Sequence, residues 1–365
     1  MTLPAILLLE NEAPFHGLAV GYEGVAKGTV AACTLMAGFP DLLTDPSYAG
    51  KIVNFTYPHV GNAGVVPDEL QSGNVAASAA VAREFSKTAA NRQSAETIDV
   101  FLKRNRIPAI EGIDTRTIAG LATQRGSVRA VLGCGAFADL GMLEKEFARS
   151  DQEWRVPVAG TEKPYDWKES VPESPRYRVV VYDFGVKRGF LRRLAGFGCA
   201  VRLVPAGYPA GKTLAENPDG VVFSAGPGIP ERRPEALSAA REFFGRLPLW
   251  GVGIGAGILA AAMGARIVVN NRSHIGVQPV GRAGEPSGEM TAQCHDFWIE
   301  AESLAEAGLA PTHFHLNDGS VEGFKSDALQ VIGVLFHPEA EPGPRDSLYL
   351  FDLFFKMLNE RRKNA

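Results

Sequence analysis

The sequence predicts an α/β protein with an N-terminal α+β domain at residues 1–150 and a C-terminal doubly wound α/β domain at residues 177–365. Three observations lead to this prediction. The chain has 365 residues, enough for two domains of about 150 residues each. Residues 151–176 contain four prolines and no helical or strand periodicity, which is typical of a linker. After this linker, apolar strands alternate regularly with helices.

Composition excludes several classes of protein. Lys and Arg total 37 against 41 Asp and Glu, a formal net charge of -4, so no basic excess indicates a nucleic-acid partner. With 45% hydrophobic and 21% charged residues, the chain has the composition of a folded, soluble protein. The cysteines are scattered without a CxxC pair, so we expect no disulfide scaffold, no metal site and a reducing cytoplasm. They are Cys33, Cys134, Cys199 and Cys294.

We expect no segment to cross a membrane. The start of the chain, MTLPAILLLENE, lacks the positive flank and the cleavage site of a signal peptide, and it is predicted to form a strand. Residues 247–265 are uncharged over a length that could span a bilayer, but the run contains five glycines and a proline. A strand, LPLWGVG, followed by a helix, AGILAAAMG, explains this run without a bilayer.

In the N-terminal domain, β-rich segments alternate with turns and helical stretches. The segments AILLLE at residues 5–10 and KIVNFTYP at residues 51–58 are predicted strands. The segments AASAAVAREFSKTAA at residues 76–90 and AETIDVFLKRNR at residues 95–106 are predicted helices. This mixture predicts the α+β class.

In the C-terminal domain, the alternation of strand and helix predicts a parallel sheet covered on both faces. The predicted strands are YRVVVYDF (177–184), AVRLVPA (200–206), GVVFSAG (220–226), LPLWGVG (247–253) and LQVIGVL (329–335). The predicted helices lie at residues 187–197, 233–247 and 256–264, with a short one after the second strand and an amphipathic one at 347–363.

Ligands of such sheets bind beyond the carboxyl ends of the strands, so the loops after the strands are the candidate sites. Three of these loops are SAGPG at residues 224–228, GVGIGAG at residues 251–257 and FHPEAEPGP at residues 336–344. Each also has a purely structural interpretation, because glycine at a strand end often serves only the turn.

The glycine-rich turn at residues 251–257 is compatible with a phosphate loop. Its position between a strand and a helix matches the dinucleotide fingerprint, in which glycines let a pyrophosphate approach the helix N-terminus. That fingerprint requires an acidic residue at the end of the next strand, and the segment ARIVVNNR has none. A nicotinamide dinucleotide therefore remains an alternative ligand, in its 2′-phosphate form.

The same turn is also compatible with a nucleophile elbow. A tight turn from strand to helix places one residue at its apex with backbone N–H groups around it, as acyl transfer requires. Here the apex residue is Gly253, which has no side chain that could attack a substrate. His337 and Glu339, two residues apart on a later loop, would then be a base and its orienting group without a nucleophile.

Motifs throughout the chain resemble those of one family, the small, glutamine-amidotransferase subunit of carbamoyl phosphate synthetase. In the N-terminal half, these motifs are FHG (15–17), LTDPSYAGKIVNFTYPHVGN (43–62) and IDTR (113–116). In the C-terminal half they are YDFGVKR (182–188), SAGPGIP (224–230) and HPEAEPGP (337–344). The resemblance implies an N-terminal domain specific to this subunit, followed by a class I glutamine amidotransferase-like domain.

In that family a cysteine in the motif GICLGHQ attacks the glutamine amide, a His-Glu pair activates it, and ammonia passes to the large subunit. In this chain the motif reads GVGIGAG, so Gly253 stands at the nucleophile position and Gly257 at the position of a substrate-binding glutamine. The family motif AQNHGF reads AQCHDF, which places Cys294 and Asp296 at altered pocket positions. We therefore expect glutamine to be neither hydrolysed nor well bound.

Other positions of the family's site are retained. They are the His337 and Glu339 pair, the oxyanion positions Gly226 and Ile254, and the pocket positions Ser47, Gly228 and Phe297. The resemblance implies a glutaminase-defective small subunit that docks on a carbamoyl phosphate synthetase large subunit and supports synthesis from free ammonia. It implies no cofactor in this chain, with ATP and Mg on the large subunit. The alternatives are a pseudoenzyme that binds another small molecule or a regulatory partner, and the dinucleotide-binding domain.

Overall fold

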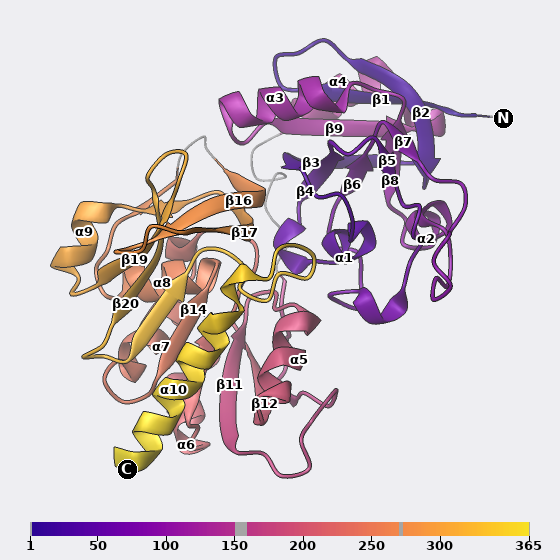
Figure 1. Ribbon diagram of the computed structural model, residues 1–365. Coiled ribbons are helices and arrows are strands. Elements are labelled where there is room, and N and C mark those ends of the chain that lie inside the picture. Colours follow the sequence, from indigo (N-terminus) through magenta and orange to yellow (C-terminus); the bar gives the residue numbers. More distant parts are fainter. Residues whose placement is uncertain (1, 150–158, 270–272, 365) are drawn as a thin grey trace. The chain divides into compact units, whose positions relative to one another are not determined.

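The computed structural model describes residues 2–149, 159–269 and 273–364 (Figure 1). The chain divides into two compact units. The N-terminal unit comprises Met1–Pro157 and Asn271–Gly276, and the C-terminal unit comprises Val158–Asn270 and Val277–Ala365. The first part of the expected linker, residues 151–158, lies outside the described residues. Its remainder contributes strand β10 (Tyr165–Asp166), which pairs with the edge of the C-terminal sheet.

The N-terminal unit is built on a sheet of seven strands that closes on itself in the order β1-β2-β8-β6-β4-β3-β9. These strands are β1 (Pro4–Leu9), β2 (Phe15–Gly21), β3 (Val25–Cys33), β4 (Lys51–Phe55), β6 (Ala79–Val81), β8 (Pro108–Glu111) and β9 (Arg129–Cys134). A small separate sheet pairs β5 (His59–Val60) with β7 (Glu84–Phe85). Leu7, Ile52 and Leu132 are fully buried in the core of this unit because alternate strand residues point inward.

Among the described residues of this unit, the α-helices are α1 (Phe39–Leu43), α2 (Ile98–Arg104), α3 (Thr115–Arg125) and α4 (Leu140–Phe147). Three of them begin at a side chain that accepts hydrogen bonds from the first turn, namely Thr97, Asp114 and Asp139. Such caps satisfy the N–H groups that a helix leaves unpaired at its start. The aspartate of the IDTR motif thus has a structural role as the cap of α3.

The helix predicted at residues 76–90 is wrong. This segment contains β6 and β7, and the three residues of β6 are buried. In β6, Ala80 pairs with Val53 of β4 and with Ala109 of β8, so the segment lies in the interior of the closed sheet. The high helix propensity of alanine is a weak preference that pairing on both sides of a strand overrides.

The C-terminal unit contains the predicted parallel sheet, in the order β12-β11-β13-β14-β21. Its strands are β11 (Tyr177–Asp183), β12 (Cys199–Pro205), β13 (Gly220–Phe223), β14 (Leu249–Val252) and β21 (Val331–Val334). The helices of the unit are α5 (Arg188–Gly196), α6 (Ala210–Ala215), α7 (Pro234–Phe243), α8 (Ile254–Ala262), α9 (Ala301–Glu306) and α10 (Tyr349–Asn364). The α/β fold class is therefore confirmed.

Helices cover both faces of the parallel sheet (Figure 1). Along β11, Val180 and Tyr182 pack in one core with α7 and α8, through residues such as Phe243. The alternate residues of the same strand, among them Val181, pack in a second core with α5 and α10, through residues such as Phe351. This alternation explains why the strand is apolar throughout, because both of its faces are buried.

The sequence did not predict the antiparallel extension of this sheet. Beyond β21 the order continues β20-β19-β16-β17, with β15 and β18 beside β20. These strands are β15 (Ile267–Val268), β16 (His274–Arg282), β17 (Gly288–His295), β18 (Trp298–Ile299), β19 (Ala310–His315) and β20 (Val321–Ser326). The extension brings β17, which carries Cys294, into the same sheet as the strands that precede the candidate loops.

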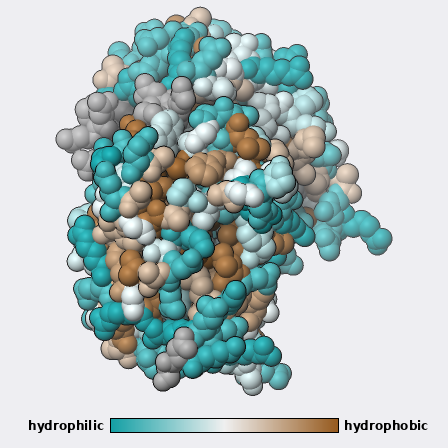
Figure 2. All heavy atoms as spheres, turned by 60° about the vertical axis from the view of Figure 1, so that its left-hand side comes forward, coloured by the Kyte–Doolittle hydropathy of each residue, from teal (hydrophilic) through white to brown (hydrophobic). Residues whose placement is uncertain are grey.

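None of the helices in the described residues combines the length and the apolar character that crossing a membrane requires. The uncharged run at residues 247–265 forms β14 and α8, as predicted. On the face drawn in Figure 2, hydrophobic side chains are interspersed with hydrophilic ones. Exposed apolar residues of the C-terminal unit include Leu316 and Val269, and single exposed apolar side chains of this kind are normal on folded proteins.

Candidate functional site

The turn between β14 and α8 has the backbone of a nucleophile elbow. Gly253 occupies its apex with φ 55° and ψ -122°, and its N–H donates to the Val334 carbonyl at 2.9 Å. A Cβ at this position would lie 3.3 Å from the Cα and Cβ of Ala225, a tight contact that a small shift relieves. The structure thus places Gly253 at the apex, in a conformation that is strained for residues with a side chain.

The neighbouring glycines of this turn are required by packing. A Cβ on Gly251 would lie 2.7 Å from the backbone nitrogen of Ala256, and a Cβ on Gly255 would lie 2.0 Å from the Phe223 carbonyl oxygen. Ala256 itself is fully buried. The glycine pattern is therefore explained by contact between α8 and the strands beneath it, without a pyrophosphate.

Two backbone N–H groups beside the apex are available as oxyanion donors. Gly226 and Ile254 make no hydrogen bond through their N–H groups within the described part of the chain. Gly226 has φ 157°, and a Cβ there would lie 2.0 Å from the Phe184 carbonyl oxygen, so the position requires glycine. Ser224 fixes this loop, because its hydroxyl accepts from the Phe184 N–H at 3.0 Å. Unpaired N–H groups at a helix start are suited to stabilise a developing negative charge.

His337 and Glu339 form a buried acid–base pair on the loop after β21. The His337 Nδ1 lies 3.2 Å from the Glu339 Oε1, and the two residues are 4% and 1% exposed. The His337 N–H donates to the Ala292 carbonyl of β17 at 2.8 Å. This arrangement orients an imidazole as a general base requires.

Lys187 holds the loop that carries this pair. Its Nζ lies 2.9 Å from the Glu339 Oε1 and also donates to the carbonyl of Ala340. Burial disfavours the charged carboxylate, but the positive charge of Lys187 and the hydrogen bond with His337 outweigh it, lowering the pKa of Glu339 to about 2. Sequence reasoning missed Lys187 as a site residue, although it lies in the YDFGVKR motif.

Asp183 positions Lys187. Its Oδ1 accepts hydrogen bonds from the Gly185 and Val186 N–H groups, each at 2.9 Å, and thereby closes the turn before α5. Burial raises the pKa of Asp183, and these hydrogen bonds oppose the increase. The YDFG motif therefore fixes the turn from which Lys187 reaches the Glu339 carboxylate.

The pocket positions around Gly257 are closely packed. A Cβ on Gly257 would lie 2.4 Å from the Pro230 Cγ and 2.7 Å from the Phe297 Cε2, so neighbours fill the space of a side chain there. Phe297 is buried and Asp296, beside it, is partly buried. A glutamine side chain at position 257 would require Pro230 or Phe297 to move.

The other positions that the sequence assigned to the pocket are each described within their own unit. Gly228 has φ 111°, and a Cβ there would lie 3.6 Å from the Ile254 Cδ1, so it adjoins the oxyanion position. Cys294 is a buried thiol on β17. Ser47 belongs to the N-terminal unit, in a turn where its N–H donates to the Asp45 Oδ1 at 2.9 Å.

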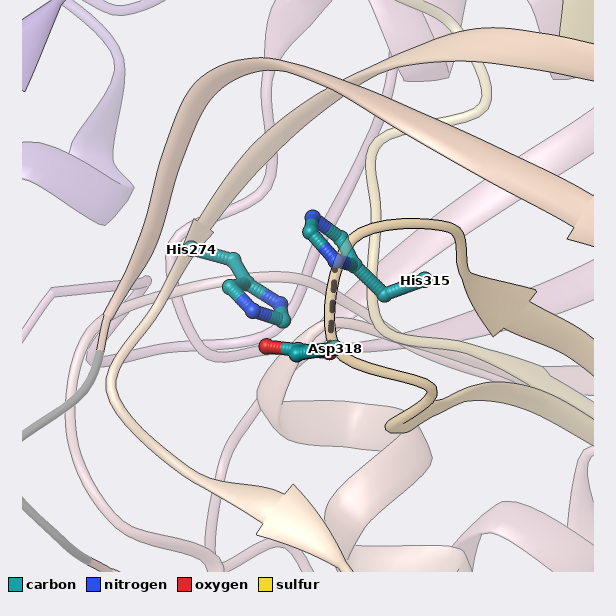
Figure 3. A group of neighbouring side chains, drawn as sticks. All are labelled: His274, His315 and Asp318. Carbon is teal, nitrogen blue, oxygen red and sulfur yellow. Dashed lines mark ion pairs between the residues drawn. The ribbon is translucent and has the colours of Figure 1, made fainter.

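Two pairs of side chains in the C-terminal unit have atoms that could bind a metal. The His315 Nδ1 lies 3.2 Å from the Asp318 Oδ1 on the hairpin between β19 and β20 (Figure 3). The His295 Nε2 lies 3.4 Å from the Glu322 Oε2. Each pair supplies two ligands, whereas protein zinc sites use three or four, so neither pair is by itself a complete site. His274, also drawn in Figure 3, is in the segment assigned to the N-terminal unit.

Comparisons with known proteins agree with the motifs. Residues 7–132 match the model of the carbamoyl-phosphate synthase small chain, CPSase domain, and residues 180–357 match that of glutamine amidotransferase class-I. The carbamoyl phosphate synthase small chain of Thermosynechococcus vestitus is 38% identical over 100% of this chain and 98% of its own.

Two further relatives carry the same description. The small chain of Syntrophotalea carbinolica is 37% identical over 99% of this chain and 100% of its own. The chloroplastic small chain of Oryza sativa is 32% identical over 98% of this chain and 83% of its own. With an elbow, an acid–base pair and both domain matches in one chain, the protein belongs to the carbamoyl-phosphate synthase small chain family.

Proposed function

We propose that this chain is the small subunit of a carbamoyl phosphate synthase complex and that its own glutaminase activity is absent or very weak. Its partner would be the large subunit, which would bind ATP and Mg and form carbamoyl phosphate from free ammonia. The chain itself would hold no cofactor. Relatives named as carbamoyl phosphate synthase small chains, matched over almost their whole length, support the assignment of the partner.

One observation carries the proposed loss of glutaminase activity. Gly253 stands at the apex of the elbow, where acyl transfer from glutamine requires a thiol. Without it no covalent intermediate can form at this turn, and removal of one member of a catalytic triad costs on the order of 10⁴ to 10⁶ in turnover. The backbone around Gly253 supports this interpretation, because the elbow itself is retained.

A second observation concerns the binding of glutamine. Pro230 and Phe297 occupy the space into which a side chain at Gly257 would extend, and Cys294 cannot donate hydrogen bonds as an amide would. The side-chain amide of glutamine and its α-amino and carboxyl groups would therefore lack polar partners in the site. This loss weakens the binding of glutamine strongly. His337 and Glu339 then act as a structural pair.

The test is a nitrogen-source assay on the complex purified with its natural large subunit. We expect carbamoyl phosphate synthesis with ammonium chloride and none above background with glutamine. Glutamate release from glutamine by the isolated chain should also stay at background. A glutaminase rate near that of ordinary amidotransferases would overturn the proposal. Failure to recover any large subunit with the full-length chain would overturn the proposed partnership.

A second candidate function is a binding protein that uses the altered pocket for another ligand. Asp296 favours it, since a partly buried carboxylate there would select a cationic group instead of the glutamine amide. A thermal-shift screen of the isolated chain against small amines, amino acids and nucleotides distinguishes the two candidates, because a ligand of the folded state raises the melting temperature. We expect Asp296→Asn to abolish any such shift.

A further inference from the structure

A cavity of about 360 Å³ lies within the N-terminal unit, apart from every residue assigned above. Its wall is formed by β2, the residues after β7, the start of α2 and the end of β8. The volume is in the range of small-molecule sites in proteins. Leu3 and Leu18 line it and are 38% and 41% exposed, so part of the wall is apolar and open to a ligand.

One carboxylate of this cavity is buried and incompletely satisfied. Glu111 ends β8 and its side chain is 10% exposed. Its Oε2 accepts a hydrogen bond from the Phe85 N–H at 2.9 Å. Its Oε1 makes no hydrogen bond to the described residues, and its ion pair with the Lys87 Nζ spans 3.6 Å. The Oε1 is therefore held only by a long ion pair at the wall of the cavity, where the ammonium group of a ligand can approach it more closely than Lys87 does.

The positive charges of the cavity differ in how firmly they are held. The Lys103 Nζ contacts the Asp99 Oδ2 at 2.7 Å within α2, and the Asp99 Oδ1 accepts from the Gly21 N–H at 3.0 Å. Lys87 is 77% exposed, and its contact with Glu111 is too long for a hydrogen bond. A ligand could therefore displace Lys87 from Glu111, and an anionic group of the ligand could then pair with Lys87.

We propose that this cavity binds a small zwitterion of the α-amino-acid class with an aliphatic side chain. The ligand's ammonium group would bond to the Glu111 Oε1, its carboxylate would pair with the displaced Lys87, and its side chain would lie against Leu3 and Leu18. Two charge-assisted hydrogen bonds, one at each end of the ligand, would then replace the long ion pair between Glu111 and Lys87. The site is independent of the proposed function, because it shares no residue with the glutaminase-like site.

The experiment titrates the full-length chain with three matched probes by isothermal calorimetry. L-Leucine carries both charged groups, isoamylamine lacks the carboxylate and isocaproate lacks the ammonium group. We expect saturable 1:1 binding of leucine, weaker binding of isoamylamine and no detectable binding of isocaproate. Absence of saturable leucine binding at millimolar concentration would overturn the proposal.

Two variants assign the charges. Glu111→Gln keeps an acceptor for the Phe85 N–H. It should weaken the binding of leucine and of isoamylamine at least about tenfold. Lys87→Met should weaken the binding of leucine to a similar extent, because the carboxylate loses its partner, and should leave the binding of isoamylamine at least as tight, because the competing cation is gone. Lys87 is exposed, so this second variant remains informative if Glu111→Gln does not fold. Glu69→Gln, at an exposed residue outside the cavity, is the matched control and should bind like the natural chain. Leucine binding that is unaffected by Glu111→Gln and Lys87→Met would refute the site.

Discussion

The elbow and the loop after β21 contrast within one site. The elbow is defined by its backbone, with Gly253 in the left-handed region and with the N–H groups of Gly226 and Ile254 unpaired among the described residues, and its apex carries no side chain. The loop after β21 is instead fixed by side chains, since His337 and Glu339 form a continuous buried network with Lys187. The comparison teaches that one part of the site is held by backbone geometry and the other by a buried network of charged side chains.

The largest expected effect would break this contrast by restoring the nucleophile. Gly253→Cys alone should raise glutaminase activity by less than about tenfold, because the substrate still lacks its partners. Adding Gly257→Gln and Cys294→Asn should raise it by about 100-fold or more over the natural chain, if Pro230 and Phe297 yield to the new side chain. The rate of glutamate release from glutamine measures the activity of the single and of the triple variant.

Glu302→Cys in the same assay is the control, since it adds a thiol at an exposed position of α9 in the same unit, outside the elbow turn. A gain equal to that of the triple variant from Glu302→Cys would contradict the assignment of the apex to Gly253. Full activity from Gly253→Cys alone would instead contradict the inferred loss of glutamine binding.

The next largest effect concerns the retained network. Lys187→Met leaves the buried Glu339 carboxylate without its cation, so it should lower the free energy of unfolding by about 3 to 5 kcal/mol. Lys356→Met is the matched control, because Lys356 is exposed on α10 and lies 4.0 Å from Glu360. We expect less than about 0.5 kcal/mol from the control. Urea denaturation measures the free energy of unfolding of both variants. Equal losses of stability would contradict the stabilising role of the buried network.

A third prediction tests the oxyanion backbone. Gly226→Ala would place a Cβ 2.0 Å from the Phe184 carbonyl oxygen and should destabilise the fold by at least about 2 kcal/mol. Gly211→Ala, where no heavy atom lies within 4 Å of the new Cβ, should stabilise α6 by about 0.5 to 1 kcal/mol. Thermal unfolding of the two variants should therefore give shifts of opposite sign. A tolerated Gly226→Ala would mean that the loop at residue 226 is free to move.

The last prediction is a pH dependence of the stability. The pKa of Glu339 is lowered from 4.5 to about 2, so its stabilising contribution is fully present above pH 4.5 and is lost as the pH falls toward 2. Glu339→Gln should therefore lose less stability than the natural chain over that pH interval. Glu360→Gln, at an exposed position, should follow the natural chain. Equal slopes for Glu339→Gln and the natural chain would contradict the lowered pKa.

Much of the C-terminal unit could be predicted from the sequence, since its strands are apolar on both faces and alternate with helices. The elbow could be placed by its glycines, because Gly251 and Gly255 are required by close backbone contact. The antiparallel extension could not be predicted, because β16, β17 and β20 contain polar residues and glycines even where they are buried, so no apolar run marks them. The helix predicted at residues 76–90 failed because pairing with β4 and β8 decides its structure.

Within the site, the sequence indicated positions but not their connections. Lys187 lies 152 positions before Glu339 in the chain, so no local pattern joins them, and only the fold brings its Nζ to 2.9 Å from the carboxylate. The same applies to Pro230 and Phe297, which close over Gly257 from different parts of the unit. The assignment of Gly253 to the nucleophile position rests on the motif and on the turn together.

The φ of 55° at Gly253 has a consequence for how such a chain can change over time. A residue with a Cβ in this region costs on the order of 1 to 3 kcal/mol of folding free energy, whereas glycine adopts it freely. Replacing a reactive residue there by glycine would thus improve folding while ending catalysis, and the reverse change would have to be selected against that gain. The backbone conformation of this turn would therefore favour the inactive chain with glycine over the active chain with a reactive residue.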